Sequence, residues 1–578
     1  MAFNPKRSIS LPAACLISIP ILVACDSTSA PPNEPTSGTS SCSYSVTNGF
    51  AIPHGVKSMA DRGKLSEDQE LPVTVTLTLN NPNDLQQMLH DLYDPTSPSF
   101  HQFLTPDEFR ARYAPSESQV ADVRAFLETH GLHDFSLDPN GYLLRTRGSV
   151  GALNSAFMTE LHEFRDAGEV RYFAPATEPV LPSSLPVQAV VGLENTNQHH
   201  NHLRAADIQG GAKPSTLNGS GPNNGLSPSD IKTAYNIPGS VNGSGQTLAL
   251  VELDGYTASD VSSYESQFGL TQVPLTNVLI DGATGGDDCG GGGLEVTLDI
   301  ELMTAIAPGA NQIMVYMGPN STQGLLDVYS KIANDNTAKQ ISTSWGLTET
   351  IPSAATLNSE NTIFQQMAIQ GQSFYAAAGD SGAFDDGSTL SVDDPASQPF
   401  VVGVGGTKLH ITFGTSAYVS ETSWNDGFPY GPEGGGGGIS TIWSQPAYQS
   451  GVGGVGSGAS TTMRNVPDVS LEAEPNSGYA VYYNGAWGVV GGTSCAAPLW
   501  AAFNGLVNQQ RVTHSKTPLG FPNTALYTIG SGGSYGADFH DINNSSTNLY
   551  FPAVTGYDLS TGWGSFKGTG LFNSLAAF

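Results

Sequence analysis

Hydrophobic and polar residues alternate strictly from Val73 to Leu79, as they do in a strand with one buried face. Three stretches with helical spacing follow, at 84–92, 106–113 and 117–130, and a second strand pattern covers 142–147. Strands and helices in this order predict a small α+β domain of the split βαβ, or ferredoxin-like, type. We assign it to residues 48–194.

The pattern changes from residue 226 onward. Apolar runs that are nearly free of charge occur at 247–253, 312–316, 340–344 and 373–378, and helical patterns occur at 259–268, 295–307 and 499–507. Continuous apolar runs are typical of parallel strands that are buried on both faces. Residues 226–578 are therefore predicted to form a larger α/β domain with a parallel sheet.

Between the two domains, residues 195–225 are rich in Gly, Ser and Asn and include His199, His200 and His202. Such a cluster could bind a metal ion, but nothing in the sequence holds these ligands in a fixed geometry. We expect a solvated linker, which is also a natural place for a proteolytic cut.

The N-terminus has the pattern of an export signal. Lys6 and Arg7 precede an apolar run at 11–24 that is shorter than the roughly 20 residues of a membrane-spanning helix. The run ends in a sequence that resembles the bacterial lipobox, where cleavage before Cys25 leaves its thiol to carry diacylglycerol. We expect a signal peptide at 1–24, a Ser-, Thr- and Pro-rich tether at 25–47 and an exported, lipid-anchored precursor; an ordinary secretory signal is the alternative.

Composition narrows the possible functions. The 578 residues are 39% hydrophobic and 13% charged, which excludes a disordered chain. With 22 Lys and Arg against 52 Asp and Glu, the chain lacks the basic surface that binding to nucleic acid requires. Residues 226–578 hold 8 basic and 29 acidic residues, a balance that suits an acidic working environment or simply confers solubility.

Five cysteines are present. Removal of Cys15 with the signal peptide and lipidation of Cys25 would leave Cys42, Cys289 and Cys495, an odd number. A disulfide between Cys289 and Cys495 and free thiols both remain open.

One serine has the setting of a nucleophile. Ser494 follows Gly491 and Gly492 and comes just before an apolar stretch that reads as a buried helix. Glycines let a substrate backbone approach, and the start of a helix supplies amide donors and the positive end of a dipole. A structural helix cap is the alternative interpretation of the same residues.

The sequence offers carboxylates rather than histidine as the base for this serine. After residue 226 only His410, His514 and His540 occur, and none lies in a triad motif. Glu295 and Asp299 are four residues apart on one face of a predicted helix that contains no Lys or Arg. Because like charges at this spacing destabilise a helix, a functional role is favoured.

A third acid, Asp380, ends the uncharged run at 373–378, and strand ends are where sites assemble in parallel sheets. The sequence Asp380-Ser381-Gly382 also mimics the signature of aspartic peptidases, but those enzymes need two copies and an all-β fold, and neither is present.

Together these residues resemble the sedolisin family of serine-carboxyl peptidases, including its kumamolisin branch. The resemblance runs from residue 73 to the C-terminus, and the stretch at 94–109 is similar to the family's activation prodomain. It implies a subtilisin-like fold with helices on both faces of the parallel sheet. By position, the resemblance makes Ser494 the nucleophile, Glu295 the general base, Asp299 its supporting acid and Asp380 the oxyanion-hole acid.

The resemblance also implies supporting groups. Glu252 and Trp345 match the extra members of the hydrogen-bond network. One structural Ca²⁺ is implied near the C-terminus, with these ligands: the carboxylates of Asp541 and Asp558 and the carbonyl groups of Ile542, Val554 and Gly556.

The implied activity is hydrolysis of peptide bonds in acid. Glu295 accepts a proton only when it is ionised, and Asp380 donates to an oxyanion only when it is protonated. The prodomain would inhibit the enzyme and be removed by self-cleavage within 195–225, leaving proteins and peptides as substrates. The alternatives are a non-catalytic surface protein on the same fold and a Ser-His-Asp hydrolase.

Overall fold

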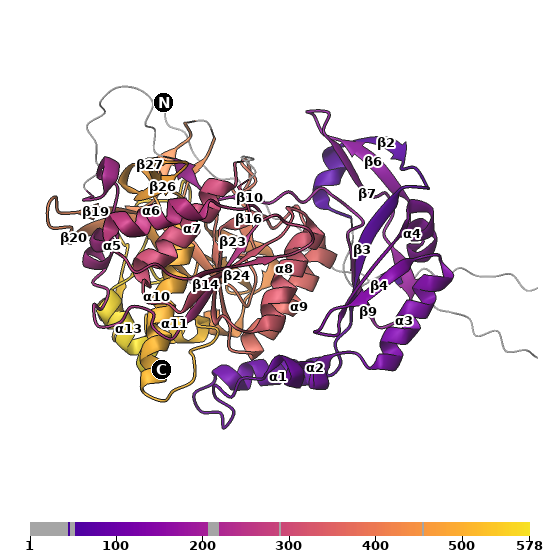
Figure 1. Ribbon diagram of the computed structural model, residues 1–578, viewed down its shortest axis with the longest axis horizontal. Helices are drawn as coiled ribbons and strands as arrows, with labels where there is room; N and C mark the ends of the chain where they lie inside the picture. The colour runs from indigo at the N-terminus through magenta and orange to yellow at the C-terminus, as the bar shows by residue number, and fades with distance from the viewer. Residues whose placement is uncertain (1–43, 47–51, 206–218, 288–290, 430, 453–455) are drawn as a thin grey trace, which may run out of the picture. The chain divides into compact units, whose positions relative to one another are not determined.

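The computed structural model describes residues 44–46, 52–205, 219–287, 291–429, 431–452 and 456–578. An eight-stranded sheet lies at the centre of the C-terminal part (Figure 1). Its order is β13-β14-β12-β15-β17-β19-β20, and β25 also pairs with β19. In chain order these strands are β12 (Thr247–Glu252), β13 (Leu275–Leu279), β14 (Gln312–Met317), β15 (Gln340–Thr343), β17 (Ser373–Ala377), β19 (Val402–Ile411), β20 (Tyr418–Ser423) and β25 (Val469–Glu472).

All neighbours in this sheet are parallel except β19 and β20. Helices α7 (Gly293–Ile306) and α10 (Thr493–Thr513) lie on one face, and α8 (Thr322–Asp335) and α9 (Ala354–Ile369) lie on the other (Figure 1). Successive residues of β12 serve both faces, because Leu250 packs in the core that contains α7 and α10 whereas Val251 packs in the core that contains α8 and α9. This explains the continuous apolar runs and confirms the predicted α/β architecture.

The prodomain has its own antiparallel sheet in the order β4-β5-β3-β9. This is the order of a split βαβ fold, so the α+β prediction is confirmed. Thr105 and Ser116 cap the second and third helices and accept hydrogen bonds from the amides of Glu108 and Gln119. The elements are β3 (Glu70–Leu77), α1 (Pro82–Tyr93), α2 (Pro106–Tyr113), α3 (Glu117–Thr129), β4 (His133–Leu137), β5 (Leu143–Ser149), α4 (Val150–Phe157) and β9 (Val187–Val191).

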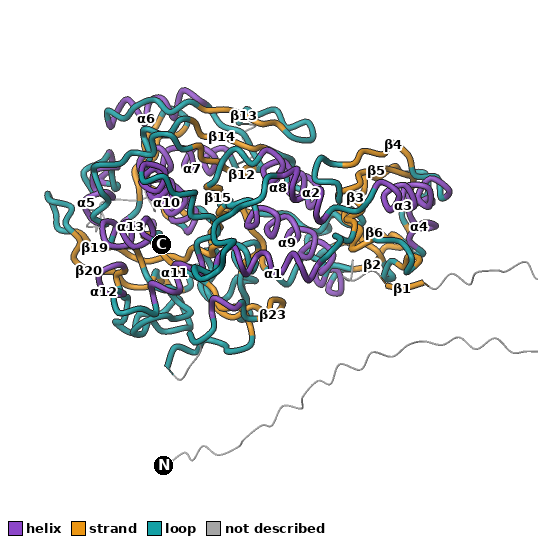
Figure 2. The backbone as a smooth tube through the Cα atoms, turned by 90° about the horizontal axis from the view of Figure 1, so that it is seen from below, coloured by secondary structure: helices purple, strands orange, loops and turns teal. Residues whose placement is uncertain are grey.

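The prodomain sheet packs on α8 and α9, which lie beside it in both views (Figures 1 and 2). Tyr142 donates a hydrogen bond to Gln366 Oε1 at 3.0 Å. Arg145 Nε donates to Asp327 Oδ1 at 2.7 Å. One hydrophobic cluster contains core residues of the prodomain together with residues of α8 and α9. The prodomain therefore covers the face of the large sheet opposite α7 and α10.

Smaller elements complete the fold. The additional helices are α5 (Pro228–Ala234), α6 (Ala258–Phe268), α11 (Asn523–Gly530), α12 (Tyr535–Asp538) and α13 (Gly568–Ala577). The additional strands are β1 (Tyr44–Val46), β2 (Ala60–Lys64), β6 (Leu161–Arg165), β7 (Arg171–Pro175), β8 (Val180–Pro182), β10 (His200–Asn201), β11 (Arg204–Ala205), β16 (Trp345–Thr348), β18 (Asp393–Asp394), β21 (Asn425–Gly427), β22 (Glu433–Gly434), β23 (Gly438–Ser444), β24 (Met463–Val466), β26 (Tyr479–Tyr483), β27 (Ala486–Gly491), β28 (Phe539–His540) and β29 (Ser565–Phe566). Within the described ranges, no helix combines the length and the apolar character needed to cross a bilayer.

The expectation of a solvated histidine cluster is wrong for residues 199–205. His199 and His202 are buried, β10 pairs with β16, and β11 pairs with β27. The partners lie more than a hundred residues further along the chain, so the local composition does not reveal them. Residues 206–218 of the linker lie outside the described residues.

Several N-terminal and cysteine predictions fall outside the described residues. These include the signal peptide, the tether up to residue 43, the lipidation site Cys25, and both Cys42 and Cys289. Cys495 is a buried free thiol next to Ser494.

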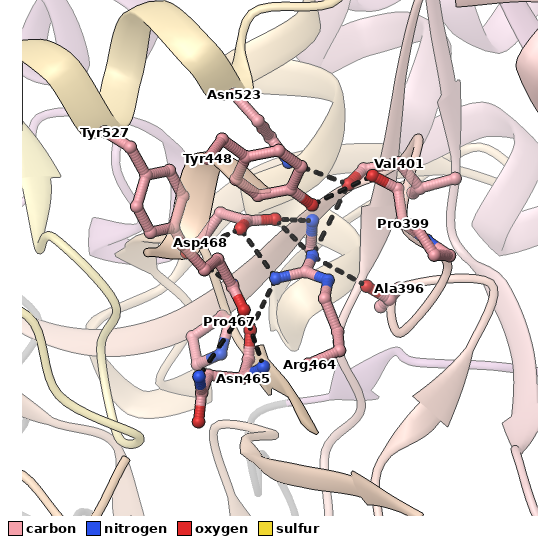
Figure 3. Close-up of polar contacts among 12 residues, drawn as sticks. Ala396, Pro399, Val401, Tyr448, Arg464, Asn465, Pro467, Asp468, Asn523 and Tyr527 are labelled. Carbon is pink, nitrogen blue, oxygen red and sulfur yellow. Dashed lines mark hydrogen bonds and ion pairs between the residues drawn. The ribbon is translucent and has the colours of Figure 1, made fainter. Parts of the chain in front are cut away.

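A buried ion pair fastens the end of the sheet that lies near α11. Arg464 donates to both carboxylate oxygens of Asp468, at 2.8 and 2.6 Å, and neither side chain is exposed (Figure 3). Asp468 also accepts hydrogen bonds from the Tyr527 hydroxyl and the Gly403 amide. The pair thereby ties β24 and β25 to β19 and α11.

Candidate active site

Ser494 lies in the first turn of α10, two residues after a glycine with a positive φ angle. Gly492 has a φ of 103°, and a Cβ atom there would lie 2.0 Å from the carbonyl oxygen of His202 and 2.8 Å from Asp380 Oδ2. Only glycine fits this close approach. The Ser494 side chain is buried, and no protein group hydrogen-bonds to its hydroxyl.

Glu295 and Asp299 lie one turn apart on α7, a helix that is buried almost all round. Neither oxygen of Glu295 has a hydrogen-bond partner among the described protein groups. The Ser344 hydroxyl donates to Asp299 Oδ1 at 2.9 Å and also lies 3.3 Å from the carbonyl oxygen of Ser494. Ser344 therefore links the acidic helix to the start of α10.

Glu252 is the last residue of β12 and joins the same cluster. Its Oε2 atom accepts a hydrogen bond from Trp345 Nε1 at 2.8 Å, and the side chain is fully buried. Burial raises the pKa of Glu252 to about 8. Asp299 lies close enough to donate a proton to it, and this contact lowers the Glu252 pKa in part.

Burial also raises the pKa of both carboxyls on α7. The raised pKa of Glu295 is lowered in part by the neighbouring Ser494 hydroxyl, while the charge of Glu252 raises it further. For Asp299, the charges of Glu252 and Glu295 add to the effect of burial. Three buried carboxyls in contact cannot all ionise together, so the cluster retains protons and titrates as one unit.

Asp380 follows β17 and faces the same turn of α10. Its Oδ1 atom accepts hydrogen bonds from the Thr493 amide at 2.8 Å and the Thr493 hydroxyl at 2.9 Å. Its Oδ2 atom has no hydrogen-bond partner, although Arg204 Nε lies 3.9 Å away. Burial raises the pKa of Asp380, and the charges of Arg204 and His202 oppose this rise.

The three histidines that could have served as a base lie elsewhere. His410 and His514 are exposed, and the ring of His540 stacks on Tyr418 with 3.7 Å between centroids. Within the described ranges, none of them contacts Ser494 or Glu295. Glu295 is the titratable side chain that neighbours the Ser494 hydroxyl.

The residues proposed to bind calcium come together at the C-terminal end. The Gly556 amide donates to Asp541 Oδ1 at 3.0 Å, and the Val554 amide donates to Asp558 Oδ2 at 2.8 Å. Among the described residues, no Lys, Arg or His forms an ion pair with either carboxylate. The described residues also contain no group of three or more His, Cys, Asp or Glu that could bind a metal. Carboxylates and backbone carbonyl groups are the ligands that a hard cation takes, whereas the contacts of Val554 and Gly556 with these carboxylates are made by their amides.

Sequence reasoning missed two members of the site. Ser344 and Thr493 hold Asp299 and Asp380 through side-chain hydrogen bonds. Ser344 directly precedes Trp345 and Thr493 directly precedes Ser494, so adjacency to a candidate residue was the one available signal. Glu301 also lies on α7, but its Oε2 atom accepts a hydrogen bond from the Tyr482 amide at 3.1 Å, outside the cluster.

Comparison with known proteins agrees with this architecture. Residues 57–196 match the family described as "Pro-kumamolisin, activation domain", and residues 283–537 match the "Subtilase family". Kumamolisin from Bacillus sp. (strain MN-32) is 34% identical over 543 residues, covering 89% of this chain and 93% of its own. Sedolisin from Pseudomonas sp. (strain 101) is 33% identical over 542 residues, covering 90% of each chain.

A solved structure supports the same assignment. The complex of Pseudomonas sedolisin, a serine-carboxyl proteinase, with two molecules of pseudo-iodotyrostatin has a TM-score of 0.55 and 32% identity, covering 61% of this chain and 98% of that chain. Likeness at this level over nearly the whole length of the relatives establishes kinship. The chain therefore belongs to the sedolisin family of serine-carboxyl peptidases, with an activation prodomain ahead of a subtilisin-like peptidase domain.

Proposed function

We propose that this peptidase is an endopeptidase that works in acid through Ser494, Glu295 and Asp299. The observation that carries the proposal is the placement of Ser494 beside a buried carboxyl cluster, with no contact from His410, His514 or His540. A serine hydroxyl needs a nearby base to become a nucleophile, and Glu295 is in that position.

In the reaction, Ser494 Oγ attacks the carbonyl carbon of the substrate while its proton passes to Glu295. Asp299, held by Ser344, keeps Glu295 in place and shares the cluster's protons. Trp345 and Glu252 extend this network into the core. In the form of the cluster whose shared protons lie on Asp299 and Glu252, Glu295 is ionised, and its raised pKa then makes it a stronger base than an ordinary carboxylate. Glu295 returns this proton to the amine as the C–N bond breaks, and water then hydrolyses the acyl-enzyme.

Asp380 supports the oxyanion that forms on the substrate carbonyl. Thr493 occupies the Oδ1 atom with two hydrogen bonds, so the proton of a neutral Asp380 resides on Oδ2, which points to the turn before Ser494. Removing a donor of this kind lowers kcat by about 10²–10³-fold. Activity therefore requires a pH at which Asp380 stays protonated.

The precursor would be organised as a signal peptide at 1–24, a tether at 25–47, the prodomain at 48–194, a linker at 195–225 and the peptidase domain at 226–578. The contacts of the prodomain with α8 and α9 and the course of residues 199–205 along the peptidase strands support its role as an intramolecular inhibitor. Lipidation at Cys25 would place the precursor on a membrane of an exporting bacterium, and cleavage in the linker would free the peptidase.

One Ca²⁺ ion would be held by Asp541 and Asp558 with carbonyl groups of Ile542, Val554 and Gly556. The support for this proposal is that Asp541 and Asp558 contact the same loop, through the amides of Gly556 and Val554. The ion would fix the loop at 554–558 and would take no part in the chemical step.

The test is hydrolysis of internally quenched peptides by chain that has first been held at about pH 4. We expect Ser494→Ala, Glu295→Gln and Asp299→Asn to lose at least about 10³-fold in kcat, because triad members act as a unit. Glu301→Gln makes the same change on the same helix outside the cluster and should retain activity. Loss of activity in His540→Gln together with an active Glu295→Gln would instead favour a Ser-His hydrolase, and an inert parent would favour a non-catalytic protein.

A further inference from the structure

The loop at 97–104, between α1 and α2, brings aromatic side chains of the prodomain against the peptidase domain. We call it the docking loop. Its Phe103 ring lies so close to two glycines of the peptidase domain that a Cβ atom on Gly371 or on Gly520 would lie 2.5 Å from the ring. Both glycines have positive φ angles, of 74° and 71°. A side chain at either position would therefore displace Phe103.

Hydrogen bonds to backbone groups fix the docking loop at the same place. The Leu104 amide donates to the carbonyl oxygen of Ile369 at 3.0 Å. The hydroxyl of Tyr93, at the end of α1, donates to the carbonyl oxygen of Ala368 at 2.6 Å and accepts from the Phe521 amide at 2.9 Å. These partners belong to the end of α9 and to the segment after α10, so the loop joins the prodomain to both parts of the peptidase domain.

His101 lies between the aromatic rings of the docking loop and meets an arginine. Its ring stacks on that of Phe100, with 3.8 Å between centroids, and the residue is 5% exposed. Arg511 Nη2 donates a hydrogen bond to His101 Nδ1 at 2.9 Å. Because an arginine can only donate, Nδ1 carries no proton and the neutral ring has its proton on Nε2. The Nε2 atom is buried and has no hydrogen-bond partner among the described residues.

Arg511 is itself buried, in the last turns of α10. Its Nε and Nη1 atoms donate to the carbonyl oxygens of Thr517 and Leu575, at 2.9 and 3.0 Å. Burial lowers the pKa of Arg511 to about 10, so the guanidinium stays charged at pH 7 and below. Ser494 lies at the other end of the same helix, roughly 25 Å away along its axis. The contact with His101 is therefore remote from the catalytic serine.

The charged groups that act on His101 are both cations: Arg511 from α10 and Lys516 from the segment that follows it. The other neighbours are rings that carry no charge in acid, namely Tyr93, Phe100 and Phe103. A proton on Nδ1 would set two donors against each other and place a second positive charge beside Arg511. Burial and the two cations lower the pKa of His101 to about 3, against about 6.5 for an exposed histidine.

From these contacts we propose that the docking loop is released by acid: it holds the prodomain on the peptidase domain while His101 is neutral and opens when His101 is protonated. Proton binding and closure of the loop exclude each other, so the closed state loses about 10²-fold in its equilibrium between pH 7 and pH 4. The contact itself does not depend on the peptidase reaction. Its consequence for inhibition rests on the proposed function, in which the prodomain is the inhibitor.

Hydrogen exchange tests the docking loop in the uncut precursor. Chain that carries Ser494→Ala is measured at intervals from pH 7 to pH 4, and each rate is divided by the intrinsic rate at that pH. We expect protection of the Leu104 amide to begin to fall below about pH 6.5 and to lose about 10²-fold by pH 4. In His101→Asn the loss should be at least about tenfold smaller. Asparagine offers Arg511 an oxygen acceptor at every pH, and it tolerates the φ of 54° at this position.

Two further variants separate the effect of charge from damage to the fold. His101→Lys places a permanent charge beside Arg511, so its protection at pH 7 should already match that of the parent at pH 4. His133→Asn makes the asparagine change at a prodomain side chain that is 51% exposed, and it should keep the parental response to pH. Protection of α7 should be the same in all variants, which shows that the peptidase domain remains folded.

An equal loss of protection in the parent and in His101→Asn would overturn the proposal and assign the opening to other groups, such as the carboxyl beside Arg145. Protection that stays unchanged down to pH 4, or that begins to fall only below about pH 5, would overturn it as well. Every protein in this experiment carries Ser494→Ala, so these results do not bear on the peptidase reaction. Conversely, an inactive enzyme would overturn the proposed function and leave the release of the docking loop intact.

Discussion

At the scale of single residues, the proposed mechanism predicts that Asp380 sets the upper pH limit of the reaction. Its Oδ2 atom can donate only while the carboxyl is protonated, and burial raises its pKa so that this state extends above the usual range. As pH rises through that raised pKa, the donor is lost and a negative charge faces the oxyanion. We expect Asp380→Asn to move the alkaline limb of the kcat profile to higher pH, because an amide donates at any pH.

The test measures kcat between pH 3 and pH 8 for the parent, Asp380→Asn and Asp380→Ala. Asp380→Ala, which removes the donor altogether, should fall by about 10²–10³-fold at all pH values. An Asp380→Asn profile that keeps the alkaline limb of the parent would show that another group controls it.

Ser344 provides a second test at this scale. Its hydroxyl donates to Asp299 inside the buried cluster, and a hydrogen bond to a charged group is worth about 1.5–3 kcal/mol. We expect Ser344→Ala to lower kcat by roughly tenfold or more with little change in KM, because Asp299 positions the base rather than the substrate. Steady-state kinetics on one peptide measure both constants, and a change confined to KM would argue against this role.

The sequence predicted the residues of the candidate site more fully than the residues that surround the site. The structure brings Ser494, Glu295, Asp299, Asp380 and Glu252 into one region, because each lies at the end of a predicted strand or on a predicted helix. The burial of His202 could not be predicted this way, because residues 200–205 pair with strands that lie far along the chain. The polar composition of residues 195–225 favoured a solvated linker, which is wrong for residues 199–205.

At the scale of elements, the buried pair of Arg464 and Asp468 holds several strands together (Figure 3). Removing one partner leaves an uncompensated charge in the core, which typically lowers the free energy of unfolding by about 3–5 kcal/mol. We expect a loss of this size for Asp468→Asn, measured by denaturant unfolding of chain that also carries Ser494→Ala and therefore stays uncut.

The exposed pair of Arg124 and Glu128 serves as the control. Its partners are also four residues apart, here on α3, but both side chains are about half exposed, so Glu128→Gln should change the free energy of unfolding by less than about 0.5 kcal/mol. Equal effects of the two substitutions would show that burial does not decide the strength of these pairs.

The loop at 554–558 offers a further test. If Asp541 and Asp558 hold Ca²⁺, calcium at 100 times its Kd should raise the free energy of unfolding by about 2.7 kcal/mol, because only the folded chain contains the site. Thermal unfolding with calcium and with a chelator measures the effect, and Asp541→Asn should abolish it. An equal Tm in both conditions would speak against a metal at this position.

Periodicity predicted these elements well where packing is regular. The expected helix at 106–113 matches α2, and the run at 312–316 differs from β14 by one residue. Helix α10 is far longer than the apolar stretch at 499–507, because its first turn carries the polar site residues and its last turns reach the surface. Short strands such as β10 and β18 were missed, since two residues carry no periodicity.

At the scale of the whole molecule, the many buried carboxyls link stability to acid. Burial raises the pKa of Glu252 to about 8 and that of Asp394 to about 7, above the values of the unfolded chain. The folded state therefore binds protons more tightly. The stability that these two carboxyls contribute is fully present below about pH 4 and is lost as the pH rises toward 7–8.

We expect the free energy of unfolding to be at least about 2 kcal/mol larger at pH 4.5 than at pH 7.5. Denaturant unfolding of the uncut Ser494→Ala chain at the two pH values measures this difference. Greater stability at pH 7.5 would mean that ion pairs, rather than buried acids, dominate the response of the fold to pH.

The central claim is that one chain carries both the acid-dependent peptidase and its first substrate. The most direct measurement is the intact mass of chain lacking residues 1–25 over time after a shift from pH 7 to about pH 4, beside Ser494→Ala and Glu295→Gln. The account predicts cleavage within residues 195–225 in the parent alone. Cleavage of all three proteins, or of none of them while the parent remains folded, would contradict it.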